Sequence, residues 1–197
     1  MDELKIAEAS LSYAASYTET FDAVAREGKF LSISSGYPLS DMKRFIKGCR
    51  ECGFPQFFLI DRRGRAVGWC DIVRRKNCPD DVGFLGVGIL KEYRGRGWGS
   101  RLIAATIAHA KKRGFREIRL EVRASNYNAI CTYRRLGFVK IAYAKNGVTT
   151  DGVSEDVWTM RCGARELRGG YFDRTAFFGR FPATGYHFTP STDGSDI

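Results

Sequence analysis

The segment with the clearest chemical potential is RGRGWG, residues 94–99, which places three glycines and two arginines in six positions. An apolar helical pattern follows it directly. The first N–H groups of a helix have no partner within the helix, and the helix dipole is positive there, so such a loop binds anions. Glycine is required where a side chain would keep a phosphate away. The segment therefore predicts a phosphate or pyrophosphate site at the start of a helix.

Three other glycine-rich loops fit this segment less well. A dinucleotide-binding loop requires G-x-G-x-x-G, whereas the spacing from Gly95 is G-x-G-x-G, and no early Rossmann strand precedes it. A Walker A loop ends in Gly-Lys-Ser/Thr, and this loop ends in Gly99-Ser100-Arg101 without the lysine. An RGG-type RNA-binding segment is flexible and is not joined directly to a periodic apolar helix. A phosphate-binding turn remains.

The charge of the chain is concentrated around the same segment. The net charge is +10, and the segment from Lys91 to Arg113 contains seven basic residues and one glutamate. A basic focus beside a glycine loop suits a polyphosphate ligand, although RNA or a solvated surface are alternatives. A nucleic-acid or ribosome-associated protein is therefore the second class of function, and its binding would weaken steeply with salt.

The cysteines and the lengths of the apolar segments limit the cellular compartments in which we expect the protein. Cys49 and Cys52 form a C-x-x-C, but no second pair follows at zinc-ribbon spacing and both histidines lie far away in the sequence. We therefore expect reduced thiols and no metal. No apolar run reaches about 18 residues, and the N-terminus has no signal core, so we expect a cytoplasmic protein without a membrane partner.

The periodicities predict an α+β order with one β-α-β unit at its centre. Residues 82–90 form a strand with many glycines, which suggests that a ligand lies against it. We expect a second helix to begin with Ser40 as its N-cap. The remaining expected elements are a strand at 4–10, helices at 10–26, 40–52, 98–113 and 126–137, a hairpin at 56–61 and 66–75, a strand at 116–123, and final strands at 139–146 and 154–160 around a turn at 147–152.

Two motifs together resemble the GNAT superfamily of N-acetyltransferases. RGRGWG is similar to the loop [Q/R]-x-x-G-x-[G/A], which cradles the pyrophosphate of coenzyme A. LEVRASNYNAICTYRRLGF, residues 120–138, resembles E-V-x-x-x-N-x-x-A-I-x-x-Y-x-x-x-G-F at the spacing of the family. The run LEVRASN is most similar to ribosomal-protein alanine acetyltransferases, whereas the hairpin and the glycine strand look more like small-molecule members.

The resemblance implies a layered α/β/α fold. Its centre would be a mostly antiparallel twisted sheet with one splayed strand pair, flanked by helices. Residues 1–162 would form the acetyltransferase domain, and residues 163–197 a C-terminal extension whose end is disordered. The extension is rich in glycines and aromatic residues and shows no clear period.

The resemblance also implies acetyl-CoA as cosubstrate and a set of residues that hold it. The backbone of Val87 and Ile89 would pair with the pantetheine arm. Asn126 would hydrogen-bond that arm, and it is also suited to cap the following helix. The pyrophosphate would be held by Arg94, Gly95, Arg96, Gly97, Trp98, Gly99 and Ser100.

Two residues are expected to transfer protons. Tyr133 would protonate the leaving thiolate, although its helical spacing to Ala129 and Ile130 also fits a core aromatic. Glu121 would be the base or a water relay, although alternation along its strand also allows a simple ion pair with Arg119 or Arg123. Many relatives carry a histidine near Asp81, and its absence here argues against a base at that position.

The resemblance implies transfer of an acetyl group to a primary amine of a small molecule, such as an amino acid, an aminoglycoside or a polyamine. The alternative is a protein N-terminus of the ribosomal-protein type. A homodimer is compatible with the sequence. A polycationic acceptor would require converging acidic residues, for which the candidates are Asp71, Asp80, Asp81, Glu121, Asp151, Glu155 and Asp156.

Overall fold

The computed structural model describes residues 4–163. The expected C-terminal extension therefore lies outside the described residues, except for Gly163. The described elements are β1 (Lys5–Glu8), a 3-10 turn (Leu11–Tyr13), α1 (Ala14–Arg26), α2 (Leu39–Glu51), β2 (Gln56–Ile60), β3 (Ala66–Val73), β4 (Val82–Ile89), a second 3-10 turn (Lys91–Tyr93), α3 (Trp98–Lys112), β5 (Glu117–Arg123), α4 (Tyr127–Arg135), β6 (Val139–Thr150) and β7 (Val153–Gly163).

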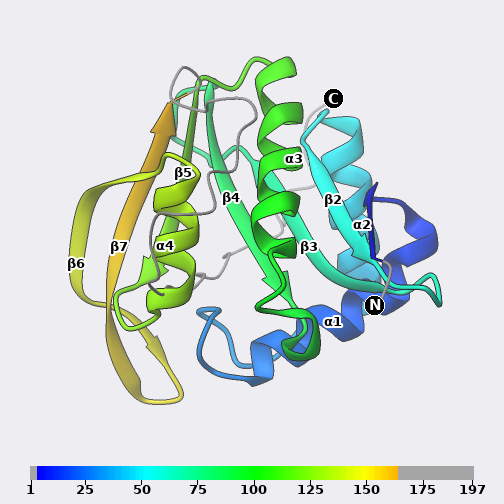
Figure 1. The fold of residues 1–197 in the computed structure, drawn as a ribbon, viewed down its shortest axis with the longest axis horizontal. Helices are drawn as coiled ribbons and strands as arrows, with labels where there is room; N and C mark the ends of the chain where they lie inside the picture. The colour runs from blue at the N-terminus through cyan, green and yellow to red at the C-terminus, as the bar shows by residue number, and fades with distance from the viewer. Residues whose placement is uncertain (1–3, 164–197) are drawn as a thin grey trace, which may run out of the picture.

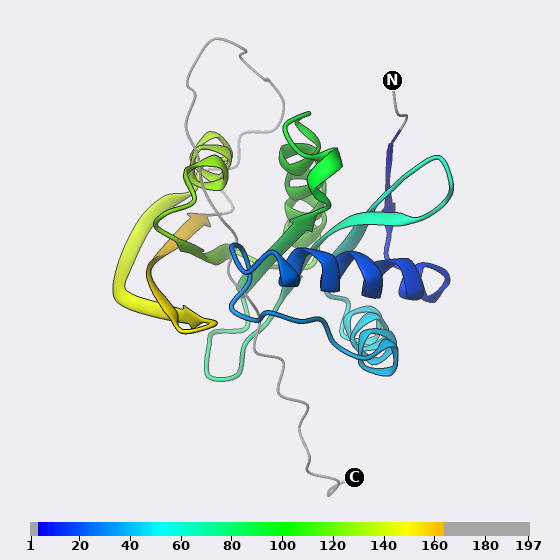
Figure 2. The same ribbon diagram turned by 90° about the horizontal axis from the view of Figure 1, so that it is seen from below.

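One seven-stranded sheet in the order β1-β2-β3-β4-β5-β7-β6 forms the middle layer. All neighbouring strands are antiparallel except β4 and β5, which are parallel because α3 connects them. Helices α1 and α2 cover one face of the sheet, and α3 and α4 cover the other (Figures 1 and 2). This arrangement confirms the predicted layered α+β fold with one central β-α-β unit.

Two apolar clusters stabilise the layers. Beneath α1, the Trp69 ring lies 4.9 Å from the Phe21 ring and 5.8 Å from the Tyr17 ring. On the other face, α3 buries Leu102, Ile103 and Ile107 against the sheet. Among residues 4–163, no helix combines the length and the apolar character needed to cross a membrane.

The glycines of β4 accommodate the protein's own side chains. A Cβ on Gly88 would lie 2.1 Å from the Trp69 ring, and a Cβ on Gly83 would lie 2.4 Å from Ile72. The expectation that these glycines admit a ligand is therefore corrected at both positions, because core packing already requires them.

Two element boundaries also differ from expectation. Helix α2 begins at Leu39 after Pro38, and no side chain caps it, so Ser40 is not the N-cap. The residues expected in the last turn continue β6 up to Thr150, and the turn is formed by Asp151 and Gly152, which both have positive φ. A register shift between Ala144 and Val148 absorbs the extra residues, which a strict alternation could not reveal.

Candidate functional site

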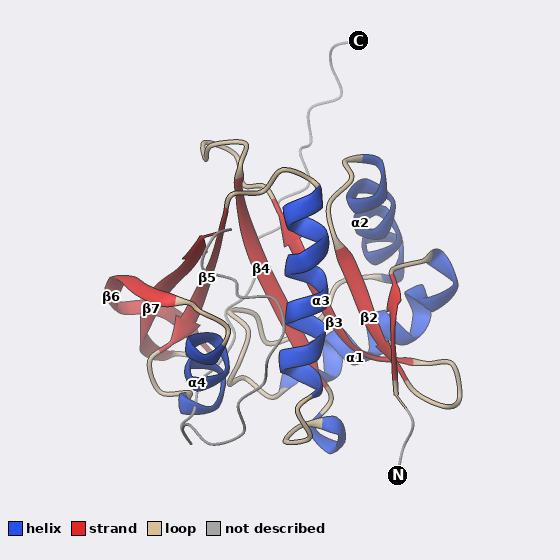
Figure 3. Ribbon diagram, turned by 45° about the horizontal axis from the view of Figure 1, so that its top comes forward, coloured by secondary structure: helices blue, strands red, loops and turns tan. Residues whose placement is uncertain are grey.

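A wedge opens in the middle of the sheet. Strand β5 pairs with β4 only at Val82, Gly83 and Phe84. The remaining residues of β4 pair with β3 alone, and the second half of β5 pairs with β7 alone, within the part of the chain that the structure describes. Figure 3 shows the two strands spreading apart toward the end where α3 begins. We call this gap the wedge. It leaves main-chain groups of both strands available to an extended ligand.

The glycine loop lies at the open end of the wedge. Gly95 has φ 75° and Gly97 has φ 78°, values that an L side chain rarely adopts. Gly97 occupies the N-cap position of α3, and no side chain caps that helix. Because α3 is 15 residues long, its first N–H groups and its dipole provide a site for an anion. The loop has the backbone that a pyrophosphate requires.

The two arginines of the loop differ in exposure and in their contacts. Arg96 is exposed, as a phosphate contact requires. Arg94 is partly buried, and its Nε donates to the Ile89 carbonyl at 2.6 Å while its two Nη groups donate to the Glu27 carboxylate. Its backbone N–H also donates to Lys91. The side chain of Arg94 therefore fastens the loop to the end of α1, and its expected contact with pyrophosphate stays a prediction.

The remaining cofactor candidates border the wedge. Val87 is half-buried and Ile89 is buried, both in the part of β4 that has no partner on the β5 side. Trp98, Gly99 and Ser100 form the first turn of α3. Asn126 occupies the N-cap position of α4, but its side chain makes no capping hydrogen bond. Its amide group is thus available to a ligand, which agrees with a binding role and removes the expected capping role.

Tyr133 is almost fully buried on α4. Its ring centroid lies 5.7 Å from that of Phe138, and 1% of the residue is exposed. Burial raises the pKa of its phenol, and the nearby Cys70 thiol raises it further. The environment keeps the hydroxyl protonated, as a general acid requires. Both expectations for Tyr133, core aromatic and proton donor, are compatible with this position.

Glu121 forms an ion pair that differs from either expected one. Arg75, in the loop between β3 and β4, donates to both carboxylate oxygens at 3.0 and 3.1 Å. The same guanidinium lies 4.1 Å from the centre of the Phe84 ring. Arg119 pairs with Glu117 instead. Glu121 is therefore held at the wall of the wedge by a side chain that sequence alternation does not indicate.

Several of the acidic candidates are paired with arginines or buried. Glu155 pairs with Arg123, Asp80 lies 3.9 Å from Arg74, and Asp71 is 1% exposed in the core. Asp81 contributes its carbonyl to the backbone of Arg116. Glu155 thus has its charge balanced by an arginine, and burial makes Asp71 inaccessible to a polycation.

Comparison with known proteins identifies the fold and its chemistry. The profile of the Acetyltransferase (GNAT) family matches residues 23–138, more than half of the chain. The chain belongs to the GNAT acetyltransferase family. It is accordingly an acyltransferase.

The names of two curated relatives specify different acceptors. A candidate ribosomal protein bS18-alanine N-acetyltransferase from Bacillus subtilis is 30% identical over 110 residues, which cover 56% of this chain and 70% of that protein. A mycothiol acetyltransferase from Cellulomonas flavigena is 35% identical over 94 residues, which cover 44% of this chain and 27% of that protein. The GNAT core is thus shared, whereas the named acceptor differs between the two relatives.

A solved structure confirms the fold independently. A candidate acetyltransferase from Acinetobacter baylyi ADP1 superposes with a TM-score of 0.78 at 17% identity, covering 84% of this chain and 94% of that chain. At this identity the similarity concerns the GNAT fold alone.

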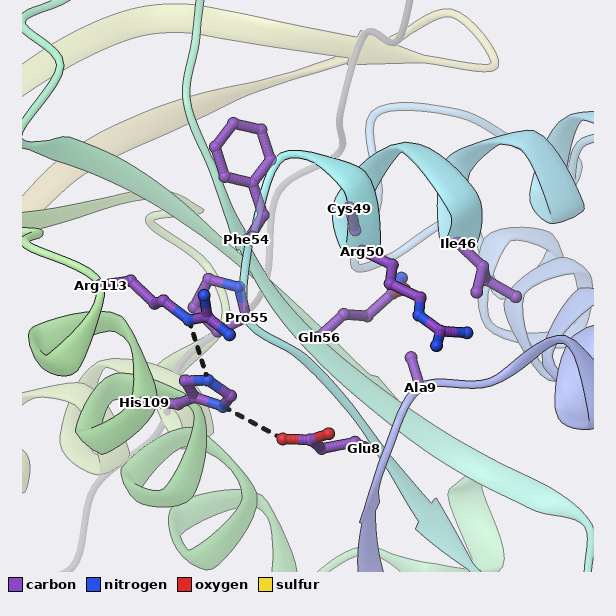
Figure 4. Close-up of a pocket in the computed structure, with 11 residues that line it drawn as sticks. Glu8, Ala9, Ile46, Cys49, Arg50, Phe54, Pro55, Gln56, His109 and Arg113 are labelled. Atoms are coloured by element: carbon purple, nitrogen blue, oxygen red, sulfur yellow. Dashed lines mark hydrogen bonds and ion pairs between the residues drawn. The ribbon is translucent and has the colours of Figure 1, made fainter.

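A separate pocket of about 100 Å³ lies between the ends of α2 and α3 (Figure 4). Arg113 donates to the His109 ring at 3.3 Å, and the other ring nitrogen lies 3.5 Å from the Glu8 carboxylate. His109 stands near the C-terminal end of α3, roughly 15 Å along the helix axis from the glycine loop. The pocket therefore does not belong to the wedge of this GNAT enzyme.

Three charged residues beside the wedge are not indicated by the sequence patterns. Glu27, Arg75 and Arg123 form ion pairs around the wedge with partners that are distant in the sequence. Alternation predicts that Arg123 points with Arg119 and Glu121 to the more exposed side of β5, yet it is 1% exposed. Neither motif contains a signal that indicates these pairings.

Proposed function

We propose that the chain is an acetyl-CoA-dependent N-acetyltransferase that acts on a primary amine with a single positive charge, such as an amino acid derivative. One observation carries the proposal: the only parallel strand pair of the described sheet separates beside an uncapped, glycine-lined helix start. This combination offers backbone groups to an extended arm and N–H donors to its pyrophosphate. The bound cosubstrate would supply the acetyl thioester.

The donor side uses groups of the loop and of the two walls. The N–H groups of the first turn of α3 would bind the pyrophosphate, with Arg96 beside them. Val87 and Ile89 would align the arm through their backbone on one wall, and Asn126 through its amide on the other. Positioning of this kind lowers the barrier because the reacting groups are already oriented.

The proton transfers would involve two residues on the β5 side. Tyr133, whose raised phenol pKa keeps it neutral, would donate a proton to the leaving thiolate. Glu121 would accept the proton from the acceptor ammonium, directly or through a water. The bidentate contact with Arg75 fixes the orientation of this carboxylate beside the wedge.

The pairing of carboxylates with arginines near the wedge supports an acceptor with one positive charge. An aminoglycoside or a polyamine carries several ammonium groups and would require several unpaired acidic side chains. Three described carboxylates near the wedge, Glu27, Glu121 and Glu155, pair with an arginine each, and others such as Asp151 are not included in this count. A protein N-terminus also carries one ammonium, and the relation to a candidate ribosomal-protein alanine acetyltransferase favours it as the second candidate acceptor.

A thiol-release assay with acetyl-CoA tests the proposal across acceptor classes. The panel contains alaninamide, a peptide with N-terminal alanine, spermidine and kanamycin. We expect kcat/KM to be higher for alaninamide or the peptide than for the two polycations. Preference for a polycation would contradict the acceptor assignment. Absence of acetyl-CoA binding in isothermal titration calorimetry would contradict the donor assignment.

A further inference from the structure

The pocket between the ends of α2 and α3 has a polar floor and a charged rim. Its volume of about 100 Å³ is well above the roughly 10–15 Å³ that a single water requires, so it admits a small organic molecule. Gln56 and Cys49 line it and are buried, whereas Arg50, Arg113 and Glu8 line it and are exposed. Figure 4 shows Arg50 reaching in from α2 on one side and Arg113 from α3 on the other. A ligand would thus meet charged groups at the entrance and an amide at the floor.

The amide of Gln56 is buried without a hydrogen bond. Only 5% of the residue is exposed, yet neither its Oε1 nor its Nε2 has a hydrogen-bond partner among residues 4–163. The Tyr17 phenol lies near this amide but outside hydrogen-bond geometry. A buried amide without partners costs free energy, which a ligand that both donates and accepts would recover.

Two guanidinium groups make the rim positive. Arg50, in the last turn of α2, forms no hydrogen bond or ion pair through its side chain within the described part of the chain. Arg113 donates through Nε to the His109 ring at 3.3 Å, and its Nη groups donate to no other described residue. Its Nη1 would lie 3.3 Å from a Cβ on Gly53, so this guanidinium reaches across to the end of α2. Two such donor forks beside one cavity suit a carboxylate.

His109 connects Arg113 to the acidic side of the rim. Because its Nε2 accepts from Arg113, the ring proton is on Nδ1, which lies 3.5 Å from the Glu8 carboxylate. In this tautomer the ring adds no charge to the pocket. The side chain of Glu8 is 72% exposed, so its carboxylate has room to accept from an ammonium group as well. The rim therefore offers two cations and one anion.

We propose that this pocket binds a small α-amino acid, of the size of glycine or alanine, at a site separate from the wedge. The carboxylate would accept from Arg50 and Arg113, and the ammonium would donate to Glu8 or to the Oε1 of Gln56. A carboxylate alone would leave the amide oxygen of the floor without a donor, and an amine alone would leave both guanidinium groups without an acceptor. The site goes beyond acetyl transfer and does not depend on it.

NMR titration of the ¹⁵N-labelled protein with alanine, without acetyl-CoA, tests the proposal. We expect saturable shifts of the Gln56 side-chain amide and of backbone amides at the ends of α2 and α3, with a Kd of about a millimolar for so small a ligand. Acetate lacks the ammonium and ethylamine lacks the carboxylate, so each should bind about tenfold or more weakly. Shifts confined to the wedge would overturn the proposal, as would no shift well above a millimolar or equal binding of alanine and acetate.

Matched variants separate binding from a general effect of charge. Arg50→Gln and Arg44→Gln remove the same charge from exposed positions of α2, but Arg44 pairs with Asp41 and does not line the pocket. The Kd of alanine should rise about tenfold or more in Arg50→Gln alone. Gln56→Met should weaken alanine binding by a similar factor, and the free energy of unfolding should stay level or rise because a buried amide is removed. Equal Kd values in the two arginine variants, or an unchanged Kd in Gln56→Met, would overturn the assignment.

Discussion

At the scale of single residues, Tyr133 combines burial with a chemical group that catalysis can use. Burial raises the pKa of its phenol, so the hydroxyl remains protonated at neutral and mildly alkaline pH. Within residues 4–163 its hydroxyl makes no hydrogen bond to another group, and its ring packs on Phe138. The ring and the hydroxyl can therefore be examined separately by substitution.

Tyr133→Phe retains the ring and removes only the proton donor. We expect kcat to fall by about 10²-fold or more, because general acid catalysis contributes roughly that factor. The Kd of acetyl-CoA and the melting temperature should change little, since the substitution breaks no hydrogen bond within the described residues. Steady-state kinetics, calorimetry and thermal unfolding measure the three quantities. An unchanged kcat would remove the acid role and leave Tyr133 as a core aromatic.

Glu121 and Arg75 permit a second test at this scale. Glu121→Gln removes the proposed proton acceptor, so kcat should fall by about 10²-fold. Arg75→Gln removes only the ion-pair partner and should have a smaller effect on kcat, because the carboxylate remains. Kinetics at several pH values distinguish these cases. An equal loss in both variants would indicate that the pair acts as a structural unit, in contradiction to the base assignment.

At the scale of elements, the glycine loop and α3 form the proposed binding unit for the phosphate groups. Gly97 has φ 78° at the N-cap of α3, and nothing lies within 4 Å of a Cβ placed there. A side chain at this position would therefore meet backbone strain and no clash with the protein. The loss of unfolding free energy on replacing Gly97 therefore reports the requirement for a left-handed backbone at this position.

Gly97→Ala should destabilise the fold by about 1–2 kcal/mol, the usual cost of a left-handed residue with a Cβ. It should also weaken acetyl-CoA binding, because the N–H groups at the start of α3 would shift. Gly48→Ala is a matched control, since Gly48 lies inside α2 with open space around its Cβ. That control should stabilise by about 0.5–1 kcal/mol. Urea denaturation measures both, and destabilisation by Gly48→Ala would contradict the explanation.

At the scale of the whole molecule, the buried acids determine how stability depends on pH. Burial raises the pKa of the Cys49 and Cys70 thiols and of the Tyr17 and Tyr133 phenols. In each case the folded-state pKa exceeds the unfolded-state value. The stabilisation is therefore fully present below the unfolded pKa values, about 8.5 for thiols and about 10 for phenols, and is lost as the pH rises above them.

The free energy of unfolding should accordingly be level near pH 7.5 and fall between pH 8.5 and 10.5, by about 1.4 kcal/mol per pH unit for each titrating group. Urea denaturation in the presence of a reductant measures this profile. Cys49→Ala removes one buried thiol and should make the decline shallower. A profile that stays level up to pH 10.5 would show that these groups do not control alkaline stability.

The fold and the glycine loop at the start of α3 were largely predictable because their signals are local. The period of residues 98–113 and the preceding glycines predict a helix start suited to phosphate, and the structure places α3 at Trp98–Lys112 with Gly97 as its left-handed N-cap. The turn expected at 147–152 was wrong, because β6 continues through an irregular register to Thr150. Hydrophobic alternation cannot reveal such an irregularity.

The sequence by itself indicated the family, the order of the elements and a glycine loop at the start of a helix, since these depend on backbone preferences and hydrophobic periods of neighbouring residues. Only the tertiary structure decided that Arg94 binds Glu27, 67 positions away, and that Arg123 binds Leu31, 92 positions away. The physical reason is that an ion pair depends on which charged groups the fold brings within hydrogen-bonding distance. RGRGWG therefore both indicates a phosphate site and supplies the arginine that fastens its own loop to the end of α1.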